Sequence, residues 1–358
     1  MHLFPFWCKI KSQVQGGERM DEQRVRIRDI ADELGMSTAT VSNVLHGKTK
    51  KVSEETVKRV QALLEERQYI PSMAGILLAQ NSSRIIGVVI NDHEKYEGHT
   101  LEDAFIASSL NHLASEIEKH SRFMMVKKTK DPEDIIPFAS MWNMDGLVII
   151  GFCDEDYHYL RNHMRIPFVI YDGYCENPER MFNITLDNYD GGFQTGALFK
   201  RDGHKHVLCI SDNNICVDKE RYEGFCAGFG GAGATDPELL LIPMAKKDRW
   251  QFYLRHLRIF HKVTAVFAVS DYYAMDLIRF LDTQGIRVPD DISVAGFDDI
   301  PLSSQISPTL TTVRQDGALR AEIAITKLLE LRSGKSTETT VMLPVELVER
   351  ESTGKHHK

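Results

Sequence analysis

Apolar residues recur with helical spacing near the start of the chain and predict three short helices. The first helix carries its apolar face on Ile27, Ile30, Ala31 and Leu34. Gly35 then allows a turn with positive φ, and Ser37 is a favourable N-cap for a second helix over 38–45. A third helix is expected to begin after Ser53, because the two acidic residues that follow it favour a helix N-terminus.

From residue 85 the pattern changes to short apolar runs that alternate with amphipathic stretches. The runs are rich in β-branched residues, as in strands buried on both faces, and lie at 85–90, 123–126, 146–150, 168–171, 207–210, 265–269 and 292–296. Helical stretches lie between most of them, at 101–119, 188–200, 248–260 and 271–284. This alternation predicts parallel sheets covered by helices on both faces, and seven or more strands over this length indicate two sheets.

The outward face of the second predicted helix carries short hydrogen-bonding side chains. They are Thr38, Ala39, Ser42, Asn43 and His46. Such a face suits a helix that lies in the major groove of DNA. Lys48, Lys50 and Lys51 follow in a loop that could reach phosphates. The alternative interpretation is an ordinary helical hairpin.

These segments resemble the lactose-repressor/galactose-repressor (LacI/GalR) family of transcriptional regulators. The resemblance is carried by residues 25–31, 37–42, 52–56 and 69–71, and it extends from residue 24 to about residue 349. It implies an α/β protein with an N-terminal all-α helix-turn-helix DNA-binding domain. A two-lobed, doubly wound parallel-sheet core, similar to periplasmic sugar-binding proteins, would bind the effector. Three chain crossings would join the lobes, near Asp187, 314–315 and 339–341.

We divide the chain accordingly into five parts. They are an N-terminal extension (1–22), the helix-turn-helix domain (23–71), a hinge helix and linker (72–83), the effector-binding and dimerisation core (84–350) and a tail (351–358). The extension is expected to be disordered or to precede the true start at Met20, because Gly16 to Arg19 is what a purine-rich ribosome-binding site would encode. The tail lacks leucine heptads, so we expect no C-terminal coiled-coil tetramer, and a dimer is favoured.

The resemblance and the pattern together give a set of expected DNA contacts. They are Arg26, Arg28, Ser37, Thr38, Ala39, Thr40, Ser42, Asn43, His46, Lys50 and Leu78. Family members often carry Arg at the position of Asn43; Arg suits guanine, whereas Asn pairs with adenine or contacts a phosphate. The family implies that a hinge leucine, here Leu78 or its neighbour Leu77, inserts into the minor groove when two copies pair on a near-palindromic operator.

Ligands of open α/β sheets bind beyond the carboxyl ends of the strands, and several polar residues are expected there. The expected effector-binding residues are Asp92, Tyr96, Asp172, Arg221, Trp250, Ser270, Asp271 and Asp298. Arg221, Ser270 and Asp298 fall on positions that often touch the effector in the family, whereas Asp271 could equally be a helix cap. Carboxylates and a guanidinium suit sugar hydroxyls, so a sugar is favoured. A nucleobase, a nucleoside or another small metabolite is the alternative.

Composition restricts the classes of function further. The chain has 358 residues and a net charge of −8, yet residues 23–84 hold 10 Lys and Arg against 7 Asp and Glu, so a basic module is joined to an acidic body. The six cysteines form no CxxC pair and suggest reduced thiols in a cytoplasmic protein. We expect no cofactor, no metal site and no catalytic constellation, which argues against a sugar-modifying enzyme. The helix-turn-helix pattern argues against a solute-binding protein of a transporter.

Overall fold

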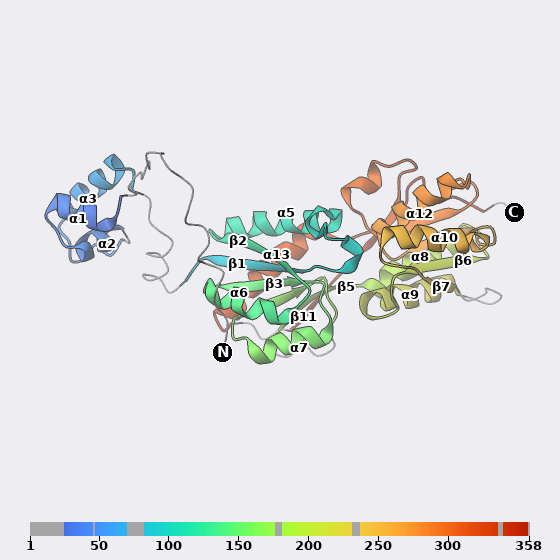
Figure 1. Ribbon diagram of the computed structural model, residues 1–358, viewed down its shortest axis with the longest axis horizontal. Helices are drawn as coiled ribbons and strands as arrows, with labels where there is room; N and C mark the ends of the chain where they lie inside the picture. The colour runs from blue at the N-terminus through green and yellow to red at the C-terminus, as the bar shows by residue number, and fades with distance from the viewer. Residues whose placement is uncertain are drawn as a thin grey trace, which may run out of the picture. The chain divides into compact units, whose positions relative to one another are not determined.

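The computed structural model describes residues 25–45, 47–69, 82–175, 181–230, 237–335 and 339–356 (Figure 1). The chain divides into two compact units, residues 1–79 and residues 80–358, and each is described by itself. His46, Leu77, Leu78 and the N-terminal extension lie outside the described residues, so the predictions made for them stay predictions.

The N-terminal unit contains three helices: α1 (Ile27–Leu34), α2 (Thr38–Leu45) and α3 (Glu54–Glu66). Gly35 ends α1 with φ 64°, the left-handed conformation that glycine adopts without a steric penalty. Ser37 and Ser53 cap the next two helices, because each hydroxyl oxygen accepts a bond of 3.2 Å from the backbone N–H three residues on. The helices enclose a small core of Ile30, Ala31, Val41, Val44, Val60 and Leu63. The predicted helix-turn-helix arrangement is confirmed.

The first lobe of the C-terminal unit contains a parallel sheet of six strands in the order β11-β5-β4-β3-β1-β2. The strands are β1 (Ile85–Asn91), β2 (Phe123–Thr129), β3 (Gly146–Ile150), β4 (Phe168–Tyr171), β5 (Phe182–Leu186) and β11 (Thr340–Leu343). The α-helices are α5 (Ala104–Lys119), α6 (Ile135–Met141), α7 (Asp154–His163) and α13 (Gly317–Arg332). Short 3₁₀ turns follow β1 and β2, namely η1 (Glu94–Tyr96), η2 (Thr100–Glu102) and η3 (Pro132–Asp134).

The second lobe contains another six-stranded sheet, in the order β12-β10-β9-β8-β6-β7, in which only β12 runs antiparallel to its neighbour. The strands are β6 (Val207–Ser211), β7 (Glu238–Leu241), β8 (Ala265–Ala268), β9 (Ser293–Asp298), β10 (Thr311–Arg314) and β12 (Glu346–Val348). The helices are α8 (Asn188–Arg201), α9 (Cys216–Phe229), α10 (Lys246–Arg255), α11 (Leu257–Phe260), α12 (Asp271–Thr283) and the 3₁₀ turn η4 (Pro301–Ser304). The two-sheet α/β prediction is therefore confirmed.

The chain passes between the lobes three times. The first two crossings lie at Asp187 and at residues 315–316, close to where the sequence placed them. The third prediction, 339–341, is wrong, because β11 occupies 340–343 and pairs with β5 in the first lobe, so the crossing follows at 344–345. The edge position of β11 explains the error, since the strand is short, two of its four residues are exposed, and its apolar run covers only three residues.

The segment that the sequence set aside as a tail packs into the second lobe as far as residue 356. Ser352 is fully buried, and its carbonyl oxygen accepts a bond of 2.8 Å from the Val294 N–H. The Ser352 hydroxyl donates in turn to the Val294 carbonyl at 2.6 Å. Residues 351–356 are thus part of the second lobe rather than a free extension.

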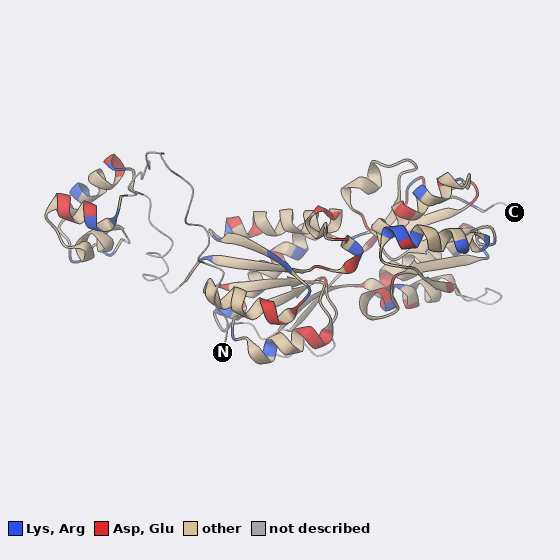
Figure 2. Cartoon of the chain, viewed as in Figure 1, with Lys and Arg blue, Asp and Glu red and all other residues tan. Residues whose placement is uncertain are grey.

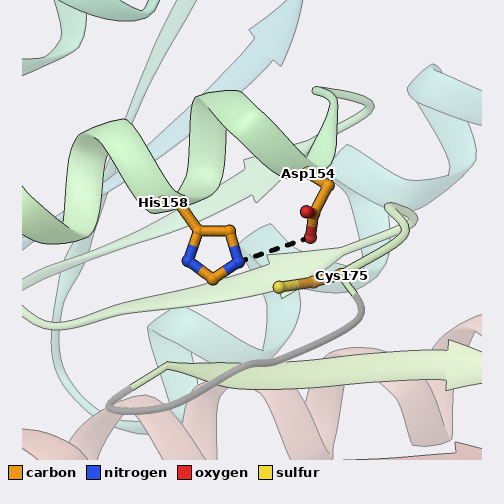
Figure 3. Close-up of side chains that lie close together, drawn as sticks. All are labelled: Asp154, His158 and Cys175. Carbon is orange, nitrogen blue, oxygen red and sulfur yellow. Dashed lines mark ion pairs between the residues drawn. The ribbon is translucent and has the colours of Figure 1, made fainter.

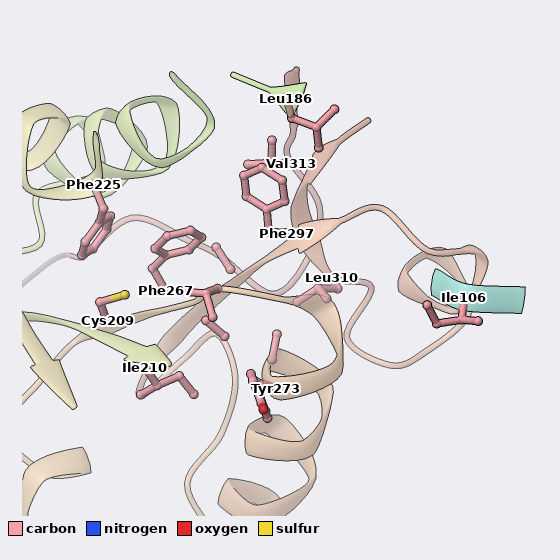
Figure 4. Close-up of a cluster of buried hydrophobic side chains, with 14 of the residues drawn as sticks. Ile106, Leu186, Cys209, Ile210, Phe225, Phe267, Tyr273, Phe297, Leu310 and Val313 are labelled. Carbon is pink, nitrogen blue, oxygen red and sulfur yellow. The ribbon is translucent and has the colours of Figure 1, made fainter. Parts of the chain in front are cut away.

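Buried aromatic and aliphatic side chains fill the second lobe and continue into the first, where the cluster includes Ile106 and Leu186 (Figure 4). Phe225 of α9 lies with its ring centroid 5.1 Å from that of Phe267 on β8, which fixes the helix against the sheet. None of the helices in the described part of the chain is long and apolar enough to cross a membrane.

Helices α8 and α9 pack with their backbones in direct contact. Four glycines face the contact: Gly192 and Gly196 on α8, and Gly224 and Gly228 on α9. A Cβ added at Gly224 would collide with the carbonyl oxygen of Tyr189, and one added at Gly192 would collide with that of Arg221. Any larger residue therefore requires the two helices to separate.

We predict that Gly224→Ala lowers the free energy of unfolding by about 2–3 kcal/mol, the usual cost of overpacking. In an unconstrained helix the same change would stabilise by up to about 1 kcal/mol, so destabilisation would identify the steric cause. The measurement is urea-induced unfolding. Gly354→Ala is the matched control, because its added Cβ would lie 3.7 Å from Pro289, an ordinary contact. Equal stability of the two variants would contradict the packing argument.

Candidate functional site

A cavity of about 220 Å³ is lined by residues of both lobes. Its lining includes residues at or just beyond the carboxyl ends of strands in each sheet: Asn91, Gly151, Asp172, Asp212, Val269 and Asp298. This is the place at which parallel sheets bind ligands. Figure 2 shows acidic segments where the two lobes meet.

Five of the eight expected effector residues line this cavity: Tyr96, Asp172, Arg221, Ser270 and Asp298. Asp92, Trp250 and Asp271 are not part of the lining. Asp92 accepts a hydrogen bond from the Thr100 hydroxyl and lies 3.5 Å from Lys128, so it holds the loop after β1 in place. These contacts, with the Thr100 bond as the largest cause, lower the pKa of Asp92.

Trp250 and Asp271 have structural roles instead. The Trp250 indole N–H donates to Asp276 at 2.9 Å, and its ring packs edge-on against Phe280, so both contacts hold the ring against α12. Asp271 is fully buried at the start of α12. It accepts bonds from the Ile300 N–H and from the Ser303 and Thr312 hydroxyls, which ties α12 to the segments around it.

Arg221 presents its guanidinium from the second turn of α9 and is only 5% exposed. Nε donates to Asn188 at 2.9 Å, Nη1 donates to the Val269 carbonyl at 2.7 Å, and the guanidinium lies 3.7 Å from the centroid of the Phe297 ring. Among the described residues no hydrogen bond from Nη2 is found. A rigidly held guanidinium with an unused edge is suited to bind a ligand oxygen.

A chain of hydrogen bonds connects Asp172 in the first lobe with Asp298 in the second. Arg320, on α13, is 1% exposed and donates to Asp172 at 3.3 Å and to Gln315 at 2.8 Å. Gln315 lies at the second crossing and donates to Asp298 at 3.0 Å. Two carboxylates that line opposite walls are thus joined through a residue at the point where the chain passes between the lobes.

The cavity holds more acidic than basic groups. Its charged lining residues are Asp103, Asp172, Asp212, Asp218 and Asp298, opposed by Lys95 and Arg221. Burial raises the pKa of Asp298 well above its ordinary value, although Arg221 acts to lower it. Burial also raises the pKa of Asp218, again with Arg221 in opposition. The excess of acidic groups disfavours anionic ligands, and a carboxyl group of raised pKa can donate a hydrogen bond in its neutral form as well as accept one.

Lys95 is a cavity residue that the sequence did not predict. It comes from η1 of the first lobe, and its pKa reflects acidic groups of the second. Burial alone would lower the pKa of the ammonium, but Tyr96, Tyr273, Asp212 and Asp218 hold it well above its ordinary value. Tyr273 also donates to Asp212 at 2.7 Å. The sequence prediction relied mainly on residues that directly follow a strand. Lys95 and Tyr273 lie further along the chain, in η1 and α12, so the prediction did not include them.

The N-terminal unit presents most of the expected DNA contacts to solvent. The exposed residues are Arg26, Arg28, Ser37, Thr38, Ala39, Asn43 and Lys50, whereas Thr40 and Ser42 are half-buried. Val41 and Val44 of the same helix, α2, are buried in the core of the unit. Helix α2 therefore turns its polar side outward, as a recognition helix requires.

Comparison with known proteins agrees with this architecture. The sequence model for bacterial regulatory proteins of the lacI family matches residues 26–72, and that for a periplasmic binding protein-like domain matches residues 197–353. The HTH-type transcriptional repressor PurR of Aliivibrio fischeri is 30% identical over 349 residues, covering 91% of this chain and 97% of that protein. PurR of Photobacterium profundum is 30% identical over 339 residues, covering 91% of this chain and 98% of that protein.

Solved structures show the same fold. The lac repressor dimer bound to operator and the anti-inducer ONPF matches with a TM-score of 0.80 at 24% identity, covering 93% of this chain and 100% of that chain. The transcriptional regulator CelR in complex with cellobiose matches with a TM-score of 0.67 at 21% identity, covering 92% and 100%.

The helix-turn-helix unit and the two-lobed core with its cavity together define a DNA-binding regulatory type of protein. The chain belongs to the lacI family of bacterial regulatory proteins. It is a DNA-binding transcriptional repressor.

We predict that Arg320→Met lowers the free energy of unfolding by about 3 kcal/mol or more, because it leaves Asp172 and Gln315 without their partner. The control is Arg287→Met, whose guanidinium is 68% exposed beside Asp290 and Asp291 and should contribute at most about 1 kcal/mol. Chemical denaturation measures both. A loss for Arg320→Met no larger than that of the control would show that the bond chain does not stabilise the core.

Proposed function

We propose that this repressor binds its operator as a dimer and that a small, hydrogen-bond-donating molecule in the cavity between the lobes controls its affinity for DNA. The observation that carries this proposal is the bond chain from Asp172 through Arg320 and Gln315 to Asp298. A ligand that contacts both carboxylates would act on both lobes and on one crossing at once. That arrangement supports coupling between ligand binding and the angle of the lobes.

The polar face of α2 supports the DNA part of the proposal. Thr38, Ala39 and Asn43 are exposed side by side on this helix, and Lys50 lies in the loop beyond it. One short helix buries too little surface for specific affinity, so we propose two copies on a near-palindromic operator, in the cytoplasm. Insertion of Leu78 into the minor groove belongs to the same proposal, although Leu78 lies outside the described residues.

A sugar is the effector class that the cavity favours. Carboxylates on both walls accept hydrogen bonds from several directions, and the unused edge of Arg221 can donate to a ring or hydroxyl oxygen. The acidic excess disfavours a phosphorylated compound. The relatives named PurR make a nucleobase-related compound the second candidate. The aromatic side chains of Tyr96, Phe105 and Phe152 in the lining could accept either a sugar ring or a flat base.

We predict that Asn43→Ala weakens binding to an operator selected from random DNA by about 1–3 kcal/mol, with little change on a scrambled duplex. Lys50→Ala should weaken both equally and reduce the salt dependence of binding by about one counterion. Fluorescence anisotropy at several salt concentrations measures both effects. The same titrations should give a complex of two chains per operator. Saturation by one chain on a single half-site would contradict the dimer, and an unchanged operator affinity in Asn43→Ala would remove that residue from the interface.

We predict that Arg221→Ala still binds operator but loses its response to effector. The variant removes the positive charge that interacts with Asp298 and with the ligand oxygen, at a cost of about 2–5 kcal/mol. A thermal-shift screen of sugars and nucleobases on the wild-type protein first identifies the ligand. Arg221→Lys, which keeps the charge but not the planar fork, should retain a weakened response. Circular dichroism confirms that each variant is folded, and a normal response in folded Arg221→Ala would exclude this residue from the site.

A further inference from the structure

Three side chains of different chemistry meet beside the cavity wall of the first lobe: Asp154, His158 and Cys175 (Figure 3). Asp154 and His158 are four residues apart on α7, so they share one face of that helix. Cys175 is buried and follows β4 by four residues. The figure shows the imidazole, the carboxylate and the thiol turned toward one another.

The separations between the three groups are close to those of a metal site. His158 Nε2 lies 3.6 Å from Asp154 Oδ1, and the ligand atoms of all three residues lie within 4.8 Å of one another. Zinc binds His nitrogen, Asp oxygen and Cys sulfur at about 2.0–2.3 Å, which places tetrahedral ligand atoms about 3.3–3.6 Å apart. The imidazole and carboxylate already have this separation, and the sulfur lies within 4.8 Å of both, so a small movement of the thiol would complete the set.

We propose that Asp154, His158 and Cys175 bind a single Zn²⁺ ion or a similar thiophilic divalent cation. The set supplies one nitrogen, one oxygen and one sulfur ligand and leaves a fourth position for water, as in sites that are open rather than purely structural. Asp154 and His158 are about one-third to two-fifths exposed, so a metal ion can reach them from solvent. If Asp154 and His158 formed only an ion pair, the buried thiol of Cys175 would not be needed beside them.

The position of the site gives the metal a consequence for the cavity. Phe152 and Cys153, which precede Asp154, line the cavity, as do Asp172 and Tyr174, which precede Cys175. A bound ion would tie the start of α7 to the segment after β4 and so fix this wall. Metal binding itself requires neither DNA nor effector, so its test is independent of the proposed function.

The test is titration of the reduced, full-length protein with Co²⁺, followed by displacement with Zn²⁺ in competition with a chelator of known affinity. We expect one equivalent to bind, with a thiolate-to-cobalt charge-transfer band that Cys175→Ser abolishes. His158→Gln and Asp154→Asn should each weaken Zn²⁺ binding at least tenfold. Binding should also weaken as the pH falls, because protons compete for the imidazole and the thiolate.

Two controls separate this site from general thiol or imidazole binding. His163→Gln alters an exposed histidine on the same helix, and Cys226→Ala removes a thiol of the second lobe; neither should change the affinity or the band. Circular dichroism confirms the fold of each variant, and His158→Gln, at a half-exposed position, provides a test even if Cys175→Ser unfolds. The proposal is overturned if no single equivalent binds with at least micromolar affinity. It is equally overturned if folded His158→Gln binds Zn²⁺ as tightly as the wild type.

Discussion

The backbone contact between α8 and α9 is the constraint on which the second wall of the cavity depends. The glycines at this contact let α9 approach until the carbonyl oxygen of Arg221 lies against Gly192. The same approach brings Asn188, the first residue of α8, within 2.9 Å of the Arg221 guanidinium. The direction of Arg221 is therefore set by helix packing, and a ligand does not need to order this side chain when it binds.

A polar link joins the lobes at the second crossing. Gln315 lies at a crossing, and its amide accepts from Arg320 of one lobe and donates to Asp298 of the other. Hydrogen bonds of this kind can be exchanged for bonds to a ligand or to water, which the proposed change in the angle between the lobes requires. The rigid packing within each lobe and the polar link between them are consistent with motion confined to the crossings.

The sequence predicted the parts of the fold that are apolar throughout, and it missed those whose burial is partial or polar. Central strands such as β1 and β3 gave continuous runs rich in β-branched residues. The edge strand β7 is half-exposed, and its short apolar run, residues 239–242, consists mostly of leucine, which does not distinguish a strand from a helix. Strand β10 was hidden because its buried Thr311 and Thr312 are satisfied by hydrogen bonds to side chains and to the C-terminal segment. Among site residues, Asp172 and Asp298 could be placed by counting from strand ends. Trp250 could not, because only the structure shows its indole N–H bound to Asp276.

The same limit explains why no metal site was expected from the sequence. Asp154 and His158 have an ordinary helical spacing that is common in ion pairs, and Cys175 lies 17 residues further on without a second cysteine beside it. Only the return of the chain through β4 brings the thiol to α7.

The acidic cavity between the lobes restricts which ligands can bind. A neutral molecule rich in hydroxyl or amino groups can form hydrogen bonds with Asp172 and Asp298, but an anion would lie among five acidic residues with only Lys95 and Arg221 in compensation. The uncharged sugar proposed as the effector meets this restriction, whereas a phosphorylated compound would not.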